Sequence, residues 1–194
     1  MAIRAFVAIE MPQAVAAGLR EVITELRPRF EALPLRWVPV ENIHLTLKFL
    51  GDIPEERISP ISEALHAQTQ GVPPFDVALN GIGVFPAGRK PHVLWIGLQS
   101  NDHLNELQRR METALKPLGY PSEARPFSPH LTLARVRRGA NFTDLKRIGE
   151  LASATKLSST ASGKVDSVTL FRSELKPGGS VYNALSRSPL SVML

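Results

Sequence analysis

The sequence has no cysteine, and this absence excludes disulfide bonds, thiolate nucleophiles and cysteine metal sites. It also has no long apolar run, because its longest apolar stretches have the length of a strand and fall far short of a membrane span. The first ten residues carry a charge at Arg4 and have neither a long apolar core nor a cleavage-like site, which favours a first strand over a signal peptide. We therefore expect a soluble, cytoplasmic protein that does not enter a membrane.

Length and charge bound the class of protein further. At 194 residues, of which 43% are apolar, the chain fits one domain or two small lobes that share a core. Lys and Arg outnumber Asp and Glu by 23 to 18, and this net charge of +5 weakly favours an anionic partner. Six basic residues lie close together between positions 125 and 147: Arg125, Arg135, Arg137, Arg138, Lys146 and Arg147. This cluster would attract a phosphate-bearing ligand, although a solvated strand end and helix face give the same pattern.

The tetrapeptide His-Leu-Thr-Leu occurs twice, at His44-Leu45-Thr46-Leu47 and at His130-Leu131-Thr132-Leu133. In an extended strand successive side chains alternate between faces, so the histidine and threonine of each copy share one face and the leucines share the other. Such a strand buries its leucines and presents an imidazole and a hydroxyl. Two of these strands could supply two histidines to one cleft.

Around these motifs the sequence repeats one plan of strand, helix and motif strand. We expect strands over 6–9, 42–51, 75–84, 92–98, 129–137, 164–175 and 181–187, with a turn at 176–179. Apolar spacing predicts helices over 15–26 (ending before Pro28), 58–65, 104–118 (capped by Asn101 or Asp102) and 142–151. The repeated order predicts an internal duplication. We therefore expect an α+β fold over residues 1–194, one bilobal domain in which two mainly antiparallel sheets face a central cleft and helices cover their outer faces.

Three chemistries compete with a purely structural role for the paired histidines. A metal site would need a third ligand, and neither motif has one on the same face, where Lys48 would repel a cation. Hydrolysis through a Ser-His-Asp triad is disfavoured because the sequence has no Gly-x-Ser-x-Gly elbow. General acid–base catalysis suits imidazole, whose pKa of about 6.5 makes both protonation states accessible near neutral pH. A structural role fits one copy of the motif better than two copies at matched positions of a repeat.

Acid–base catalysis by two histidines suits a phosphate placed between them, which the threonine hydroxyls would hold in line. The substrate should contribute reactivity through its own hydroxyl or a strained ring. A 2′,3′-cyclic phosphate at an RNA end meets that need.

The paired His-x-Thr-x motifs resemble the signature of the 2H phosphoesterase superfamily. Their context is similar to its RNA 2′,3′-cyclic phosphodiesterase branch, also called the LigT-like or 2′-5′ RNA ligase family. The segments that carry the resemblance are 4–9, 36–38, 41–51, 93–95, 125–135 and, near the C-terminus, 173–182. The resemblance implies hydrolysis of RNA 2′,3′-cyclic phosphodiester ends to 2′-phosphomonoesters, with no metal and no nucleotide cofactor. It also implies a reverse-type reaction that joins RNA ends through a 2′-5′ bond.

Carried over by motif, the resemblance implies that His44 is the general acid that protonates the departing 3′ oxygen and that His130 is the general base that activates water. Thr46 and Thr132 would hold the phosphate. Spacing alone does not distinguish the acid from the base. We expect a monomer that acts on tRNA fragments or on small cyclic nucleotides. The alternative is a non-catalytic module that holds RNA ends or a nucleotide, which would not need both histidines.

Arg135 and Lys48 are further candidates for phosphate contact. Strict alternation places Lys48 on the His44 face but Arg135 on the leucine face, so Arg135 reaches the ligand only through a bulge or twist. Candidates for base stacking are Phe49, Phe127 and Tyr182, although a core position is commoner for aromatic residues at strand ends. We expect core positions for Trp37 and Trp95 and surface positions for His66, His92 and His103.

Overall fold

The computed structural model describes residues 2–88, 90–99, 101–157, 160–176 and 179–192. These residues form nine strands: β1 (Ala2–Glu10), β2 (Leu35–Trp37), β3 (His44–Pro54), β4 (Phe75–Phe85), β5 (Val93–Leu98), β6 (His130–Val136), β7 (Ser162–Val165), β8 (Ser167–Lys176) and β9 (Gly179–Pro189). They also form four α-helices: α1 (Gln13–Arg29), α2 (Ile58–Thr69), α3 (Asp102–Leu115) and α4 (Phe142–Ala154). Three single 3-10 turns complete the chain: η1 (Val40–Asn42), η2 (Glu55–Arg57) and η3 (Lys116–Leu118).

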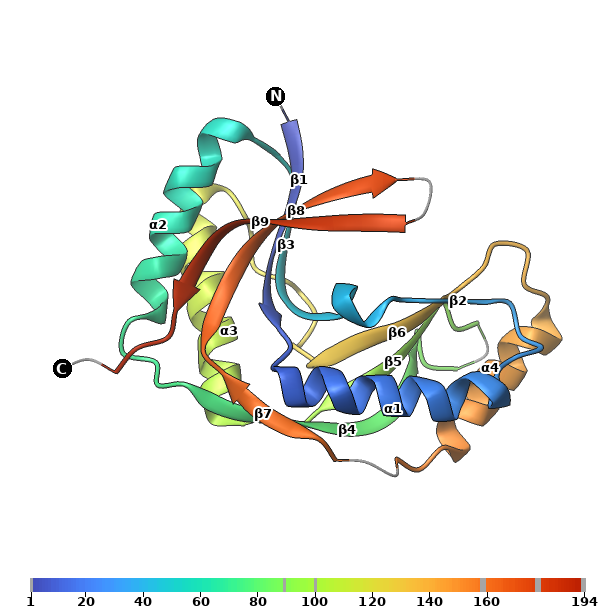
Figure 1. Cartoon of the computed structure of the whole chain (residues 1–194). Helices are drawn as coiled ribbons and strands as arrows, with labels where there is room; N and C mark the ends of the chain where they lie inside the picture. The colour runs from blue at the N-terminus through green and yellow to red at the C-terminus, as the bar shows by residue number, and fades with distance from the viewer. Residues whose placement is uncertain (1, 89, 100, 158–159, 177–178, 193–194) are drawn as a thin grey trace.

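The strands make two antiparallel sheets, which confirms the predicted α+β fold. One sheet has four strands in the order β3-β1-β8-β9, and the other has five in the order β2-β6-β5-β4-β7. The two motif strands, β3 and β6, belong to different sheets and contact each other near the middle of the molecule (Figure 1). The fold therefore brings the two histidine motifs to one region.

The helices cover the sheets, and each half of the chain contributes one helix to the sheet that holds the motif strand of the other half. Helices α2 and α3 pack on the four-stranded sheet, whereas α1 and α4 pack on the five-stranded sheet (Figure 1). A Cβ added to Gly18 of α1 would collide with Ala161 beside β7, which shows how closely this helix approaches the second sheet. As a result, the main cluster of buried apolar residues is continuous across both sheets.

Local sequence accounts for the helices. The apolar stripe predicted for α1 is buried: Val15, Leu19, Val22, Ile23 and Leu26. Asn101 caps α3, because its side chain accepts a hydrogen bond from the backbone N–H of Leu104 at 2.8 Å. Asn141 and Asp144 form a reciprocal capping box at the start of α4. No helix in the described part of the chain is both long and apolar enough to cross a membrane.

Several predicted boundaries shift by a few residues, and two predicted elements are wrong for a clear physical reason. Helix α1 continues through Pro28 to Arg29, since a proline in the last turn removes only one helical hydrogen bond. The predicted strand 164–175 is two strands, β7 in the five-stranded sheet and β8 in the four-stranded sheet, separated at Asp166. Of the predicted turn at 176–179, residues 177–178 lie outside the described residues, and the strands that flank it, β8 and β9, pair as the expected hairpin.

Candidate active site

Both motif histidines are held through the same ring nitrogen. Nδ1 of His44 lies 2.9 Å from the carbonyl oxygen of Asn42, and Nδ1 of His130 lies 2.8 Å from the carbonyl oxygen of Ser128. Because a carbonyl oxygen only accepts, each Nδ1 must carry the hydrogen and donate it. In the neutral ring Nε2 then has the free lone pair. Each imidazole is therefore set to exchange a proton with a ligand at Nε2.

The two imidazoles have aromatic neighbours, but not the same ones. Phe6 stacks on His44, with ring centroids 4.7 Å apart, and Tyr182 meets the same imidazole edge-on at 5.0 Å. Phe85 packs edge-on against His130 at 4.8 Å. His44 therefore lies on an aromatic floor formed by β1 and β9, whereas His130 lies beside β4.

This environment changes the acidity of His44. The pKa of His44 is lowered from 6.5 to about 4 by the sum of three effects, of which the largest is burial, because the charged imidazolium loses water there. The hydrogen bond to the Asn42 carbonyl raises this pKa, and the positive charge of Arg135 lowers it further. His44 is therefore neutral near pH 7 when no ligand is bound. The influence of Arg135, which lies on β6, also shows that the second motif strand directs positive charge toward the first motif.

A β-bulge follows the threonine in both motif strands, at the same motif position. The extra residue is Leu47 in the pairing of β3 with β1, and it is Leu133 in the pairing of β6 with β5. A bulge shifts the alternation of side chains by one residue. In each strand the residue after the motif therefore turns into the core, and the next one turns to the histidine face.

The bulges determine which face of the strand the side chains of Arg135 and Lys48 occupy. Arg135 is exposed on the histidine face, because β6 contains the bulge that this placement of Arg135 requires. Lys48 is only 3% exposed and lies on the core side, so the prediction that it shares the His44 face is wrong. The position in β3 that matches Arg135 is Phe49. Its side chain is 63% exposed, and the centre of its ring lies 6.2 Å from the centre of the Phe6 ring.

Lys48 has a structural partner in place of a ligand. Its Nζ donates to the Glu112 carboxylate of α3 at 2.9 Å and also to the carbonyl oxygen of Pro121. Glu112 accepts further hydrogen bonds from the Gln108 side chain and from the Glu123 backbone N–H. This buried network ties β3 to α3 and to the segment that leads into the second motif. The sequence did not predict this network, although Gln108 and Glu112 stand at helical spacing among the apolar residues of α3.

The hydroxyls of the two motif threonines are available to a ligand. Thr46 and Thr132 are half-buried, and neither hydroxyl has a hydrogen-bond partner within the described ranges, so both can bind a ligand. Across those same ranges, no three His, Cys, Asp or Glu side chains gather as a metal site. The predicted surface positions are confirmed for His66, His92 and His103. Half-buried positions are found for Trp37, Trp95, Phe127 and Tyr182.

A further residue of the site, Arg36, is brought in by strand pairing alone. Arg36 of β2 stands directly opposite Arg135 in the antiparallel pairing of β2 with β6. Opposed residues of neighbouring strands share a face, so both guanidinium groups extend the histidine face of β6. A pocket of ≈ 210 Å³ adjoins His44, and Tyr182, Arg20 and Glu10 are among its other lining residues.

The family model for the LigT like Phosphoesterase matches the chain twice, over residues 9–95 and 96–182. Each match contains one His-Leu-Thr-Leu motif, and together they span most of the chain. This chain belongs to the LigT-like phosphoesterase family. The two successive matches also confirm the predicted duplication of the LigT-like unit, whose second copy begins inside β5.

Individual LigT-like relatives match over nearly the full length. The RNA 2′,3′-cyclic phosphodiesterase of Methanothermobacter thermautotrophicus is 33% identical over 185 residues, which cover 94% of this chain and 96% of the relative. The crystal structure of TT0787 of Thermus thermophilus superposes with a TM-score of 0.78 at 31% identity and covers 97% of this chain and 98% of that one. The crystal structure of E. coli LigT complexed with 3′-AMP gives a TM-score of 0.75 at 26% identity, with coverage of 98% and 99%.

Proposed function

We propose that this chain hydrolyses RNA 2′,3′-cyclic phosphodiester ends to 2′-phosphomonoesters, with His44 and His130 as the acid–base pair. The observation that carries the proposal is the matched anchoring of both imidazoles through Nδ1, on two strands that contact each other. The name of the full-length relative, an RNA 2′,3′-cyclic phosphodiesterase, supports the substrate class. The nucleotide in the crystal structure of E. coli LigT supports a nucleotide-binding site in this fold.

The proposed reaction transfers one proton at each histidine. His130 takes a proton from water at Nε2 while the water oxygen bonds to phosphorus. The bond from phosphorus to the 3′ oxygen breaks, and His44 gives a proton to that oxygen. The product carries a 2′-phosphate and a free 3′-hydroxyl. Thr46, Thr132 and Arg135 donate hydrogen bonds to the phosphate oxygens, where charge accumulates as the water attacks.

The acid role of His44 requires a proton that this side chain does not hold near pH 7 without ligand. A bound phosphate brings negative charge beside the imidazole and partly neutralises Arg135, and both effects favour the imidazolium. Binding of substrate and protonation of His44 are therefore coupled. The resemblance assigns this role to His44. Identification of the product tests whether the 3′ oxygen is the leaving group, because its release leaves a 2′-phosphate.

The experiment that tests the proposal is hydrolysis of a 2′,3′-cyclic nucleotide and of an RNA with that end, followed by identification of the phosphomonoester. The substitutions His44→Ala and His130→Ala should each reduce kcat by roughly 10²–10⁴-fold or more, because each removes one positioned proton transfer. The control is His66→Ala, which removes an exposed histidine of α2 and should change nothing. A chelator should leave the activity intact.

Other outcomes would redirect the proposal. Full activity in either motif variant, or activity lost with chelator and restored by a metal, would exclude this mechanism. Binding of cyclic phosphates with no turnover would favour the non-catalytic module that holds RNA ends. If the 5′-hydroxyl of a second RNA attacked the cyclic phosphate in place of water, the product would contain a 2′-5′ bond. Accumulation of that joined product would identify a ligase. Action on tRNA fragments, a monomeric state and a cytoplasmic location stay predictions.

A further inference from the structure

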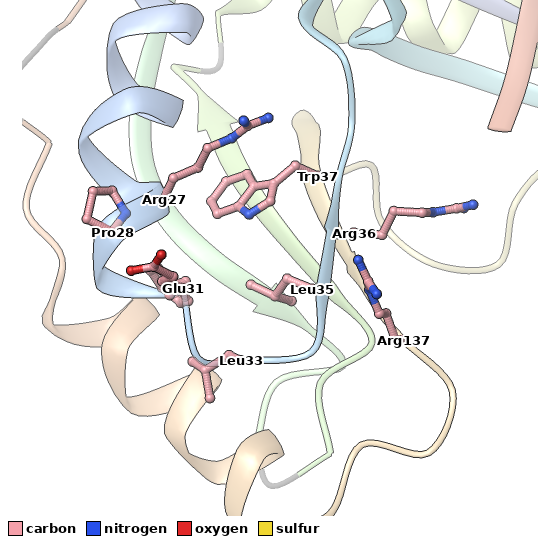
Figure 2. A pocket seen from close by; sticks show the side chains of 9 residues that line it. Arg27, Pro28, Glu31, Leu33, Leu35, Arg36, Trp37 and Arg137 are labelled. Atoms are coloured by element: carbon pink, nitrogen blue, oxygen red, sulfur yellow. The ribbon is translucent and has the colours of Figure 1, made fainter. Parts of the chain in front are cut away.

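A pocket of ≈ 600 Å³ lies at the free edge of the five-stranded sheet, where β2 is the last strand. The end of α1, the loop that follows it and β2 enclose this pocket (Figure 2). Three arginines, Arg27, Arg36 and Arg137, and one carboxylate, Glu31, line it. The lining is therefore net positive, even when the outward-pointing side chain of Arg36 is left out, and this suits a polyanionic ligand.

The floor of this β2-edge pocket is aromatic. Trp37 projects from β2 toward α1 (Figure 2) and meets the ring of Phe30 edge-on at 6.3 Å. The guanidinium carbon of Arg27 lies 5.8 Å from the centre of the Trp37 ring. Unpaired nucleobases stack on tryptophan rings and on arginine planes, largely without regard to sequence. Basic side chains over an aromatic floor are the combination that binds single-stranded nucleic acid.

Arg36 connects this pocket to the histidine face. Its side chain leaves β2 on the side opposite to Trp37 (Figure 2), where it stands beside Arg135. Like charges directly opposed on neighbouring strands repel each other. Within the described ranges no carboxylate pairs with Arg36, Arg135 or Arg137, so protein groups do not relieve this repulsion. An anion held between Arg36 and Arg135 would relieve it.

The spacing along β6 places this arginine pair near the reaction. Arg135 follows Thr132 by three residues, which is no more than about 10 Å along a strand. A phosphate held by Thr132 is therefore close to a second phosphate held by Arg36 and Arg135. Successive phosphodiesters of one RNA chain supply such a pair of anions.

We infer that the β2-edge pocket is a subsite for the RNA chain that precedes the cyclic end. Arg36, Arg135 and Arg137 hold the phosphodiesters that lead away from the histidines, and a nucleotide farther along the chain stacks in the pocket, beside Trp37. This inference rests on the proposed function and narrows it. The preferred substrate is the end of a single-stranded RNA and not a free cyclic nucleotide.

The test compares catalysis and binding in the full chain. Hydrolysis is measured with a cyclic mononucleotide and with a short single-stranded RNA that ends in a 2′,3′-cyclic phosphate. Binding is measured by fluorescence anisotropy with a labelled RNA of the same sequence that ends in a 2′-phosphate. The variants are Arg36→Gln and Arg137→Gln, and the matched control is Arg57→Gln, an exposed arginine in η2.

We expect the parent chain to have a lower KM for the RNA than for the mononucleotide. Each variant should raise the KM and Kd for the RNA by about 3–10-fold, and more than it raises the KM for the mononucleotide. Each lost phosphate contact should also reduce the salt dependence of log Kd by about 0.7. The control should match the parent chain in every measurement.

Failure of the β2-edge subsite and failure of the proposed catalysis give different results. If the variants bind the RNA as tightly as the parent, or raise the KM for both substrates equally, the β2-edge subsite is excluded while the proposed catalysis stands. If no cyclic phosphate is hydrolysed but the RNA binds and the variants weaken it, the proposed catalysis fails while the subsite stands as an RNA-binding groove.

Discussion

At the scale of single residues, His44 and His130 belong to identical tetrapeptides and make identical hydrogen bonds through Nδ1. Their difference comes from their neighbours. His44 lies on the rings of Phe6 and Tyr182 and under the influence of Arg135, and its pKa falls to about 4. Burial and charge therefore give two identical motifs different surroundings.

The lowered pKa of His44 predicts how stability changes with pH. Between pH 6.5 and 4 the unfolded chain takes up a proton at His44 that the folded chain does not, so the free energy of unfolding falls as the pH falls through this window. The loss from this group is at most about 3 kcal/mol. Urea unfolding at several pH values should show a shallower dependence for His44→Gln. The same dependence in His44→Gln and in the surface control His66→Gln would contradict the prediction.

At the scale of secondary-structure elements, the extra residue that follows the threonine of each motif strand decides which side chains face the ligand. Alternation predicted the faces of His44 and Thr46 correctly because both precede the bulge. It failed for Lys48, which follows the bulge, and the same irregularity in β6 turned Arg135 to the histidine face. A bulge forms through pairing with a neighbouring strand, and apolar spacing within one strand does not reveal it.

The buried pair of Lys48 and Glu112 predicts a coupling between β3 and α3. Lys48→Met should reduce the free energy of unfolding by roughly 3–5 kcal/mol, because it leaves the Glu112 carboxylate buried without its cation. The double variant Lys48→Met/Glu112→Leu should recover much of this loss, since it removes both charges. Chemical denaturation of the two variants measures the coupling.

The control for this pair is Lys116→Met, the same change at an exposed lysine in η3, which should stay within about 0.5 kcal/mol of the parent. A single variant Lys48→Met as stable as that control would show that the buried ion pair contributes nothing. A double variant no more stable than the single one would show that the two charges are not coupled.

At the scale of the whole molecule, the two copies of the repeat are not independent folding units. The first copy contributes α1 to the sheet that holds the second motif, and the second copy contributes α3 to the sheet that holds the first. In addition, β1 pairs with β8 from the far end of the chain. Contacts between the copies therefore hold the two motif strands together.

This exchange predicts that the part of the chain before β4, which holds the first motif, does not fold alone. A fragment of residues 1–74 lacks β8 beside β1 and lacks the sheet that α1 covers, so its apolar faces have no partner. It should show neither cooperative unfolding nor dispersed amide resonances. Refolding it together with residues 75–194 should restore both signals. A cooperative transition in the isolated fragment would contradict the prediction.

The sequence by itself determined the repeated motifs, the shared face of each histidine and threonine, and the α+β plan of two units. These features depend on spacing within a strand or helix, which is local and can be counted. It did not separate β7 from β8, because both carry strand-like residues and only their partners differ.

Only the tertiary structure decided the rest. It placed Arg36 opposite Arg135, turned Lys48 inward to Glu112, exposed Phe49 and lowered the pKa of His44. Each of these outcomes depends on groups that are far apart in the chain and meet only when the sheets form. Strand pairing and access to water are properties of the assembled fold, whereas side-chain alternation is a property of the chain.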